Sequence, residues 1–288
     1  MLAPQITKTL LAATATFMLI ACGSNDNSNN GSAQARSEQR VILGNRSSEA
    51  SFKPILSQPA DTKWQSYDRP ADYAGVTKLP TTFITMRDGV QLAASVTLPA
   101  LSEGQVDTGK YPTILIQTSY NLTAGSFVGA IGGADPFMVQ RGYATVVVDV
   151  RGTGNSTGNW EAFGADEQAD FKEVAEWVTQ QSWSNGSIGV YGVSYLGITA
   201  ILTAQQQHPA VKAAFPIVPI GDGYRDIVFT GGNVNATFIP LWMGLITGLG
   251  VLSFDALQTD PAVGLQSIIG NVLNALTGFQ VPTMLKAL

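Results

Sequence analysis

The residue with the clearest chemical potential is Ser194, in the sequence 192–197 (Gly-Val-Ser-Tyr-Leu-Gly). The apolar run 187–193 predicts a buried strand before it, and residues 195–207 predict a helix after it. A serine in such a turn projects its hydroxyl above the helix N-terminus, where backbone amides favour a developing oxyanion. We therefore predict a nucleophilic serine. The turn departs from Gly-x-Ser-x-Gly because Leu196 follows two residues later, and a glycine-serine pair can also be only a tight turn.

A serine hydroxyl needs a general base, and the sequence contains one histidine, His208. It follows Ser194 by 14 residues, at the far end of the predicted helix. At about 1.5 Å per residue, that helix separates the two side chains by roughly 20 Å. We interpret His208 as a surface residue at a helix end and not as the base.

The other polar residues do not form a cofactor or metal site. Histidine, cysteine and acidic residues are not clustered at the spacing of metal ligands, and the glycines of 151–158 lack the lysine of a phosphate-binding loop. Asp149 and Arg151 are expected to fix this glycine-rich loop by local ion pairing. We expect no cofactor and no metal.

The hydropathy pattern predicts the parallel sheet that would position these groups. A hairpin is expected over 83–98, with its turn at 87–89, and further strands over 111–117, 144–150, 187–193 and 211–218. Helices are expected near 135–140, over 166–181 and over 195–207. Alternation of strand and helix predicts an α/β fold, with a mostly parallel sheet covered by helices on both faces. Apolar helices over 238–252 and 263–276 are expected to form a lid.

Several short motifs follow one another along the chain: Met-Arg-Asp-Gly-Val at 86–90, Arg-Gly-Tyr-Ala at 141–144, Asp-Val-Arg-Gly-Thr-Gly at 149–154, Trp-Ser-Asn-Gly at 183–186, Gly-x-Ser-Tyr-x-Gly at 192–197 and Asp-Gly-Tyr-Arg at 222–225. In sequence and in order they resemble those of the cocaine esterase and X-Pro dipeptidyl-peptidase family, which includes α-amino-acid ester hydrolases. The resemblance covers roughly residues 80–250. It implies the α/β-hydrolase fold, with the first part of the core over 81–222 and the start of a helical lid over 223–288.

The resemblance also implies roles for residues around the nucleophile. Tyr120 matches a tyrosine whose hydroxyl stabilises the oxyanion, although it could merely cap the core. The backbone amide of Tyr195 would be the second donor. Members of the family carry the acid and the histidine after the lid, and Asp222 matches the lid entry better than the acid. We therefore expect this chain to be a fragment or the product of an interrupted gene, inactive by itself.

The N-terminus resembles a bacterial lipoprotein signal. Lys8 precedes an apolar run that ends in Leu-Ile-Ala at 19–21, directly before Cys22, the only cysteine. We expect Cys22 to be lipidated after removal of a signal peptide, because the run is shorter than the about 20 residues that span a bilayer. An uncleaved anchor is the alternative. Gly23 favours the outer membrane where two membranes exist, and residues 23–80 are expected to be a flexible tether and irregular lead-in.

The composition excludes one class of partner. The net charge is -5 and the 16 Lys and Arg are scattered, so we expect no nucleic-acid binding. The sequence therefore predicts a serine hydrolase of the bacterial cell envelope, periplasmic or surface-exposed, acting on small ester, amide or X-Pro peptidyl substrates through an acyl-enzyme. The alternative is a non-catalytic, lipid-anchored surface or binding protein on a decayed hydrolase scaffold.

Overall fold

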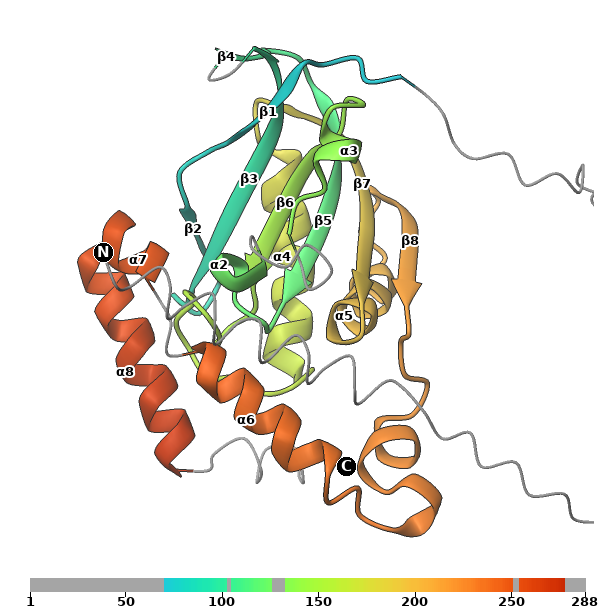
Figure 1. Ribbon diagram of the computed structural model, residues 1–288, viewed down its shortest axis with the longest axis vertical. Coiled ribbons are helices and arrows are strands. Elements are labelled where there is room, and N and C mark those ends of the chain that lie inside the picture. The colour runs from blue at the N-terminus through green and yellow to red at the C-terminus, as the bar shows by residue number, and fades with distance from the viewer. Residues whose placement is uncertain (1–69, 103–104, 126–132, 251–253, 278–288) are drawn as a thin grey trace, which may run out of the picture.

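The computed structural model describes residues 70–102, 105–125, 133–250 and 254–277 (Figure 1). The predicted signal peptide, Cys22 and most of the expected tether lie outside the described residues. Within them, the strands are β1 (Gly75–Lys78), β2 (Thr82–Thr85), β3 (Gln91–Ser102), β4 (Gln105–Val106), β5 (Tyr111–Thr118), β6 (Ala144–Asp149), β7 (Ser184–Val193) and β8 (Val211–Ile217). The helices are α2 (Leu122–Gly125), α3 (Pro136–Val139), α4 (Ala165–Thr179), α5 (Tyr195–Gln205), α6 (Phe238–Gly250), α7 (Phe254–Thr259) and α8 (Pro261–Thr277).

The strands form one sheet, in the order β1-β3-β6-β5-β7-β8, with β2 and β4 also paired to β3. Strands β6, β5, β7 and β8 are parallel, whereas β3 runs antiparallel to β6. Strands β5 and β6 are mostly apolar and mostly buried, as expected for parallel strands that are covered on both faces, whereas the middle of β8 is exposed. The predicted hairpin, the parallel strands and helices α3, α4 and α5 are confirmed, with bounds that differ by a few residues.

One face of the sheet packs on α4 and α5, which lie behind the strands in Figure 1. Apolar residues of the strands meet the stripe Phe171, Val174 and Val178 of α4, and all three side chains are buried. This stripe follows the 3.6-residue period of an amphipathic helix. The alternation of strand with helix therefore builds the core that holds β5 and β7 side by side.

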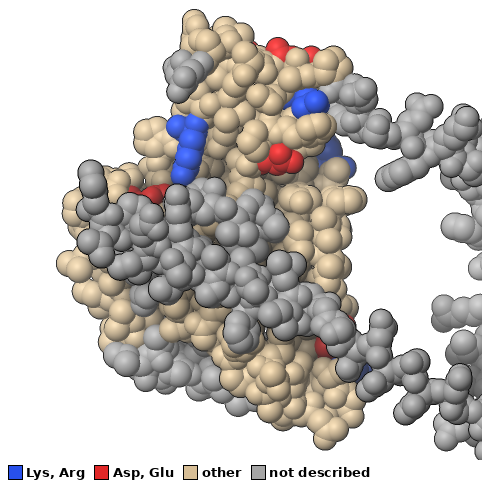
Figure 2. Space-filling view, in the orientation of Figure 1, with Lys and Arg blue, Asp and Glu red and all other residues tan. Residues whose placement is uncertain are grey.

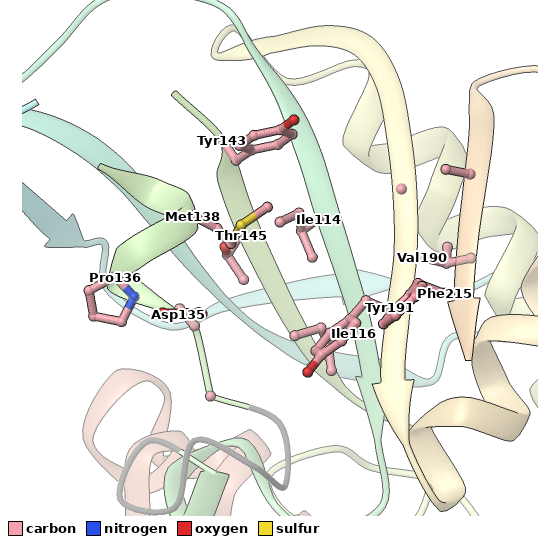
Figure 3. Close-up of a pocket in the computed structure, with 14 residues that line it drawn as sticks. Ile114, Ile116, Asp135, Pro136, Met138, Tyr143, Thr145, Val190, Tyr191 and Phe215 are labelled. Carbon is pink, nitrogen blue, oxygen red and sulfur yellow. The ribbon is translucent and has the colours of Figure 1, made fainter. Parts of the chain in front are cut away.

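The opposite face carries the short helix α3 and a cavity of about 670 Å³ (Figure 3). Ile114, Met138, Tyr191 and Phe215 are among its mostly apolar lining residues. Phe215, on the edge strand β8, is 66% exposed. Ser194 is not among the residues that line this cavity, so the cavity is separate from the turn at Ser194.

Helices α6, α7 and α8 lie against the core at the carboxyl ends of the parallel strands (Figure 1). The Asn121 side chain donates to the carbonyl of Leu249 in α6 (2.9 Å), and Ser267 of α8 donates to the carbonyls of Gly154 and Ser156 (3.0 and 3.1 Å). The segment Phe238–Thr259 is apolar and long enough to cross a membrane, with 21% of its most apolar window buried. Its contacts nevertheless place α6 on the core, while its expected role as a lid stays a prediction.

Two parts of the fold differ from the sequence prediction. Residues 41–80 were expected to be irregular, yet 75–78 form β1, which pairs with β3. The short strand β4 and helices α2 and α7 were also not predicted. These elements are only two to six residues long. Their formation depends on contacts with distant residues rather than on a local period.

Candidate active site

Ser194 occupies the turn between β7 and α5, with φ 59° and ψ -122°. Non-glycine residues rarely adopt a positive φ, and such strain costs of the order of 1–3 kcal/mol. The Ser194 amide donates to the carbonyl of Ile217 in β8 (2.9 Å), while the Ser194 carbonyl accepts the amides of Gly197 and Ile198, the third and fourth residues of α5. The neighbouring strand and helix thus hold the strained turn, and the half-buried serine stands at the N-terminus of α5.

Two glycines explain the residue pattern of this turn. A Cβ at Gly192 would lie 2.2 Å from the Cβ of Leu196, and a Cβ at Gly197 would lie 2.6 Å from the carbonyl oxygen of Ile217. Leu196 itself is 1% exposed. The second glycine therefore stands three residues after the serine because the backbone of β8 approaches α5 at that position.

Tyr120 lies beside the nucleophile. It follows β5, and because β5 and β7 are parallel neighbours, their carboxyl ends meet at the same edge of the sheet. The Tyr120 hydroxyl is 3.4 Å from the Ser194 Oγ, and its side chain is 1% exposed. The indole N–H of Trp242, in α6, donates to the same hydroxyl (3.3 Å). Helix α6 therefore contributes directly to the position of Tyr120.

The backbone amide and the phenol of Tyr195 lie in different surroundings. As the first residue of α5, its backbone amide has no intrahelical acceptor. Its side chain points into the core, where the hydroxyl donates to the Glu167 carboxylate and accepts from the indole N–H of Trp160 (2.9 Å). Phe163 stacks on the Tyr195 ring, with centroids 4.4 Å apart.

Sequence reasoning missed Glu167 as a buried group, since an acid near a helix N-terminus is favoured by the dipole alone. Glu167 is 0% exposed, and it stands one turn before Phe171 on the apolar stripe of α4. An acid in register with an apolar stripe was the available signal, because such a carboxylate must face the core.

Burial raises the pKa of Asp149 and of Glu167 to about 7 in each case. Hydrogen bonds from Asn155 and Leu122 to Asp149, and from Tyr195 to Glu167, oppose this shift but do not cancel it. Each carboxyl therefore keeps its proton in the folded state at a pH where the unfolded chain has lost it. The contribution of these two carboxyls to folding stability consequently falls as the pH rises from about 4 to about 7, and then levels off.

We predict that Glu167→Gln flattens this pH dependence. The wild-type melting temperature should decrease between pH 5 and pH 8, and the variant, which cannot ionise, should decrease less, by the equivalent of up to about 3 kcal/mol. Thermal unfolding followed by circular dichroism at several pH values measures the difference. Glu173→Gln removes a carboxylate at a half-buried position on the same helix, where it pairs with Arg87; it is the control and should retain the wild-type slope.

The structure corrects the expected pairing of Asp149 with Arg151. Arg151 donates to both carboxylate oxygens of Asp170 in α4 (2.6 Å each) and to Asp88 of the hairpin turn (2.9 Å). Asp149 instead accepts three bonds from uncharged N–H groups, namely the Leu122 amide and the amide and side chain of Asn155. Asp149 does hold the glycine-rich loop, but through neutral donors, whereas Arg151 ties the loop to Asp170 and Asp88.

The interpretation of His208 as a surface residue is wrong. Its side chain is 7% exposed, and its Nε2 lies 2.9 Å from the carboxylate of Glu176, near the C-terminal end of α4. The Nδ1 accepts the amide of Ala210 (3.2 Å). His208 follows α5, whose N-terminus carries Ser194, so it links the distal ends of α4 and α5 and is not brought to the nucleophile.

The structure thus brings together Ser194, Tyr120 and Tyr195, as the sequence predicted, and leaves His208 apart from them. Asp222 caps a short π-helical turn by accepting the amides of Tyr224 and Arg225 (3.0 Å each). No group of three or more His, Cys, Asp or Glu residues that could hold a metal is present in the part of the chain that the structure describes. The assembled groups can supply a nucleophile and oxyanion donors.

Comparison with known proteins identifies the family. The model of the X-Pro dipeptidyl-peptidase (S15) family matches residues 88–265. A protein named as a serine esterase of Mycobacterium bovis is 36% identical over 178 residues, covering 56% of this chain and 27% of that protein. Cocaine esterase of Rhodococcus sp. is 32% identical over 197 residues, covering 67% of this chain and 33% of that enzyme.

A solved structure shows the same fold. The crystal structure of a CocE/NonD family hydrolase from Staphylococcus aureus has a TM-score of 0.51 and 28% identity, covering 60% of this chain and 33% of that one. The chain spans a third or less of the length of these three proteins. Its sheet, its nucleophile turn and these matches agree: the chain belongs to the X-Pro dipeptidyl-peptidase (S15) family and has the α/β-hydrolase fold.

Proposed function

We propose that the protein containing this chain is a serine hydrolase that cleaves small ester or amide substrates through an acyl-enzyme on Ser194. The observation that carries the proposal is the position of Ser194 at the N-terminus of α5, with the Tyr120 hydroxyl 3.4 Å from its Oγ. The family membership supports the reaction class, since the matched relatives are named serine esterase, cocaine esterase and X-Pro dipeptidyl-peptidase.

In this mechanism the Ser194 Oγ attacks the carbonyl carbon of the substrate while a base removes its proton. The carbonyl oxygen becomes negatively charged and receives hydrogen bonds from the Tyr120 hydroxyl and the Tyr195 amide. The positive end of the α5 dipole stabilises the same charge. Collapse of the tetrahedral intermediate expels the alcohol or amine and leaves the acyl group on Ser194, and water then releases the acid.

We propose that the general base and its carboxylate partner come from sequence outside these 288 residues. His208 is the only histidine of the chain, and it is paired with Glu176. The matched regions are 27% and 33% of the lengths of the Mycobacterium and Rhodococcus relatives, which leaves room for both groups in proteins of this family.

Labelling with a fluorophosphonate probe tests the proposal on the protein as its gene encodes it. The probe forms a covalent bond only with an activated serine, so we expect one label per molecule, located on the peptide that contains Ser194 by mass spectrometry. Heat-denatured protein is the control and should not react. A folded protein that takes up no label would refute the proposed activity.

That negative result would favour a second function, a non-catalytic binding protein on a hydrolase scaffold. The observation behind this alternative is that His208, the one histidine of the sequence, pairs with Glu176 and does not contact Ser194. A binding protein would remain folded and would not be labelled, whereas an enzyme would be labelled at Ser194.

We also propose that the protein is anchored in the bacterial cell envelope by a lipid on Cys22. The sequence Leu-Ile-Ala-Cys at 19–22 supports this placement. Cells that express the protein are expected to accumulate a larger precursor when globomycin blocks signal peptidase II, and to incorporate radiolabelled fatty acid without the drug. Cys22→Ser should lose the fatty acid. Unchanged gel mobility with globomycin, together with no incorporated fatty acid, would exclude lipidation.

A further inference from the structure

The side chain of Tyr195 is held both by packing and by hydrogen bonds at its hydroxyl. It is 1% exposed and lies among three aromatic rings, those of Phe163, Trp160 and Trp242, with centroids 4.4, 6.1 and 6.3 Å away. A buried tyrosine needs a partner for its hydroxyl, and here the hydroxyl both donates and accepts a hydrogen bond.

Glu167 is the partner that organises this cluster. One carboxylate oxygen accepts the Tyr195 hydroxyl, and the other accepts the amide of Phe163 (2.9 Å). Phe163 has a φ of 75°, and the preceding Ala162 has a φ of 48°, so Glu167 also holds an unusual backbone turn. A single side chain of α4 thus fixes both the Tyr195 hydroxyl and the ring that stacks on Tyr195.

The anchor lies one residue from the nucleophile. Tyr195 is the first residue of α5, and its Cα joins the anchored side chain to the amide that we assign to the oxyanion. Because the phenol is held at its far end, the Cα and Cβ of Tyr195 are fixed at the start of α5, and the amide projects from this fixed point. Charge stabilisation by a backbone amide depends on such prior orientation.

The aromatic residues around Tyr195 also contact Tyr120, whose hydroxyl is the other proposed oxyanion donor. The Trp160 ring packs edge-on against Trp242, with centroids 5.6 Å apart, and the Trp242 indole donates to the Tyr120 hydroxyl. Tyr120 and Tyr195 also pack edge to face, with centroids 6.1 Å apart. Both proposed oxyanion donors therefore belong to one buried aromatic cluster.

We propose that Glu167 is a positioning residue for the oxyanion hole, which it orients through the Tyr195 side chain. The inference rests on the proposed function, because it assigns Glu167 to the hydrolysis at Ser194. Glu167 does not touch the substrate. It keeps the Tyr195 amide directed at the carbonyl oxygen while that oxygen gains charge.

Turnover of a small ester by purified variants of the full gene product tests this role. We expect Glu167→Ala to lower kcat by about tenfold to a hundredfold, as misplaced catalytic groups do, with KM changed less than about threefold. Glu167→Gln keeps an oxygen that can accept the Tyr195 hydroxyl and should restore most of kcat. Tyr195→Phe removes the anchored hydroxyl and should lower kcat as Glu167→Ala does.

The double variant Glu167→Ala/Tyr195→Phe separates positioning from general destabilisation. If Glu167 acts through the Tyr195 hydroxyl, the double variant loses no more kcat than either single variant. Asp170→Asn is the matched control, because Asp170 is buried one turn further along α4 and pairs with Arg151 rather than Tyr195. It should lower the melting temperature while leaving kcat within about threefold of the wild type, below the loss expected for a misplaced group.

Two results would overturn the inference. One is an unchanged kcat in folded Glu167→Ala or, if that variant does not fold, in folded Tyr195→Phe. The other is a loss of kcat that Asp170→Asn shares at an equal decrease in melting temperature. Either result leaves fluorophosphonate labelling of wild-type Ser194 intact, whereas failure of the proposed function would abolish that labelling. The two failures are therefore distinguishable.

Discussion

Replacement of Ser194 by alanine is expected to abolish ester hydrolysis by the full gene product, with a loss in kcat of the order of a millionfold. The substitution removes only the side-chain hydroxyl, and without it no acyl-enzyme can form. Residual turnover above the uncatalysed rate would come from the oxyanion donors and from substrate binding. The measurement is steady-state hydrolysis of a chromogenic ester, with protein concentration set by absorbance and folding verified by circular dichroism.

The matched control for Ser194→Ala is Ser187→Ala. Ser187 lies on β7, the strand that leads into the turn, and is also half-buried, but it stands seven residues before Ser194. Its alanine variant should hydrolyse the ester at the wild-type rate. Retention of turnover in Ser194→Ala would show that another residue is the nucleophile, and the proposed function would then fail.

Replacement of Tyr120 by phenylalanine is expected to lower kcat by about 10²–10³-fold, the loss that follows removal of one oxyanion donor. The ring remains, so its contacts with Tyr195 are kept and the fold should be stable. KM should change little, because the hydrogen bond strengthens only as charge develops on the substrate oxygen. Steady-state kinetics with the same ester gives both constants.

Tyr111→Phe is the control for the loss of a phenolic hydroxyl. Tyr111 begins β5, whereas Tyr120 follows its end, and the Tyr111 hydroxyl donates to Asp107 far from the nucleophile. Its removal should affect stability only. If Tyr120→Phe retains the wild-type kcat, Tyr120 is a core residue at a strand end and the oxyanion is stabilised by other groups.

The parallel core of the fold could be predicted from the sequence because its signals are local. The strand that begins at Tyr111 and the strand that begins at Ala144 are unbroken apolar runs, and the stripe of α4 repeats at the helical period. Once these elements alternate, the right-handed crossover rule leaves few ways to assemble them. Placement of Ser194 and Tyr120 at one edge follows, since both come directly after a parallel strand.

The contacts that hold the site could not be predicted in the same way. Glu167 and His208 are polar residues at helix ends, where exposure is the usual outcome, and only the packing of α4 against α5 buries them. The bond from Trp242 to Tyr120 joins residues separated by 122 positions. Local composition carries no information about such pairs, because each depends on how separate elements dock.

The hydrogen bond between the Ser194 amide and Ile217 gives the edge strand β8 a part in the chemistry. Edge strands open more readily than central ones, and amide hydrogen exchange reports such opening. The exchange rate of the Ser194 amide should therefore follow the docking of β8 rather than the global unfolding of the sheet. A partner strand that pairs with the outer edge of β8 would slow this exchange and hold the turn at Ser194 in its strained conformation for longer.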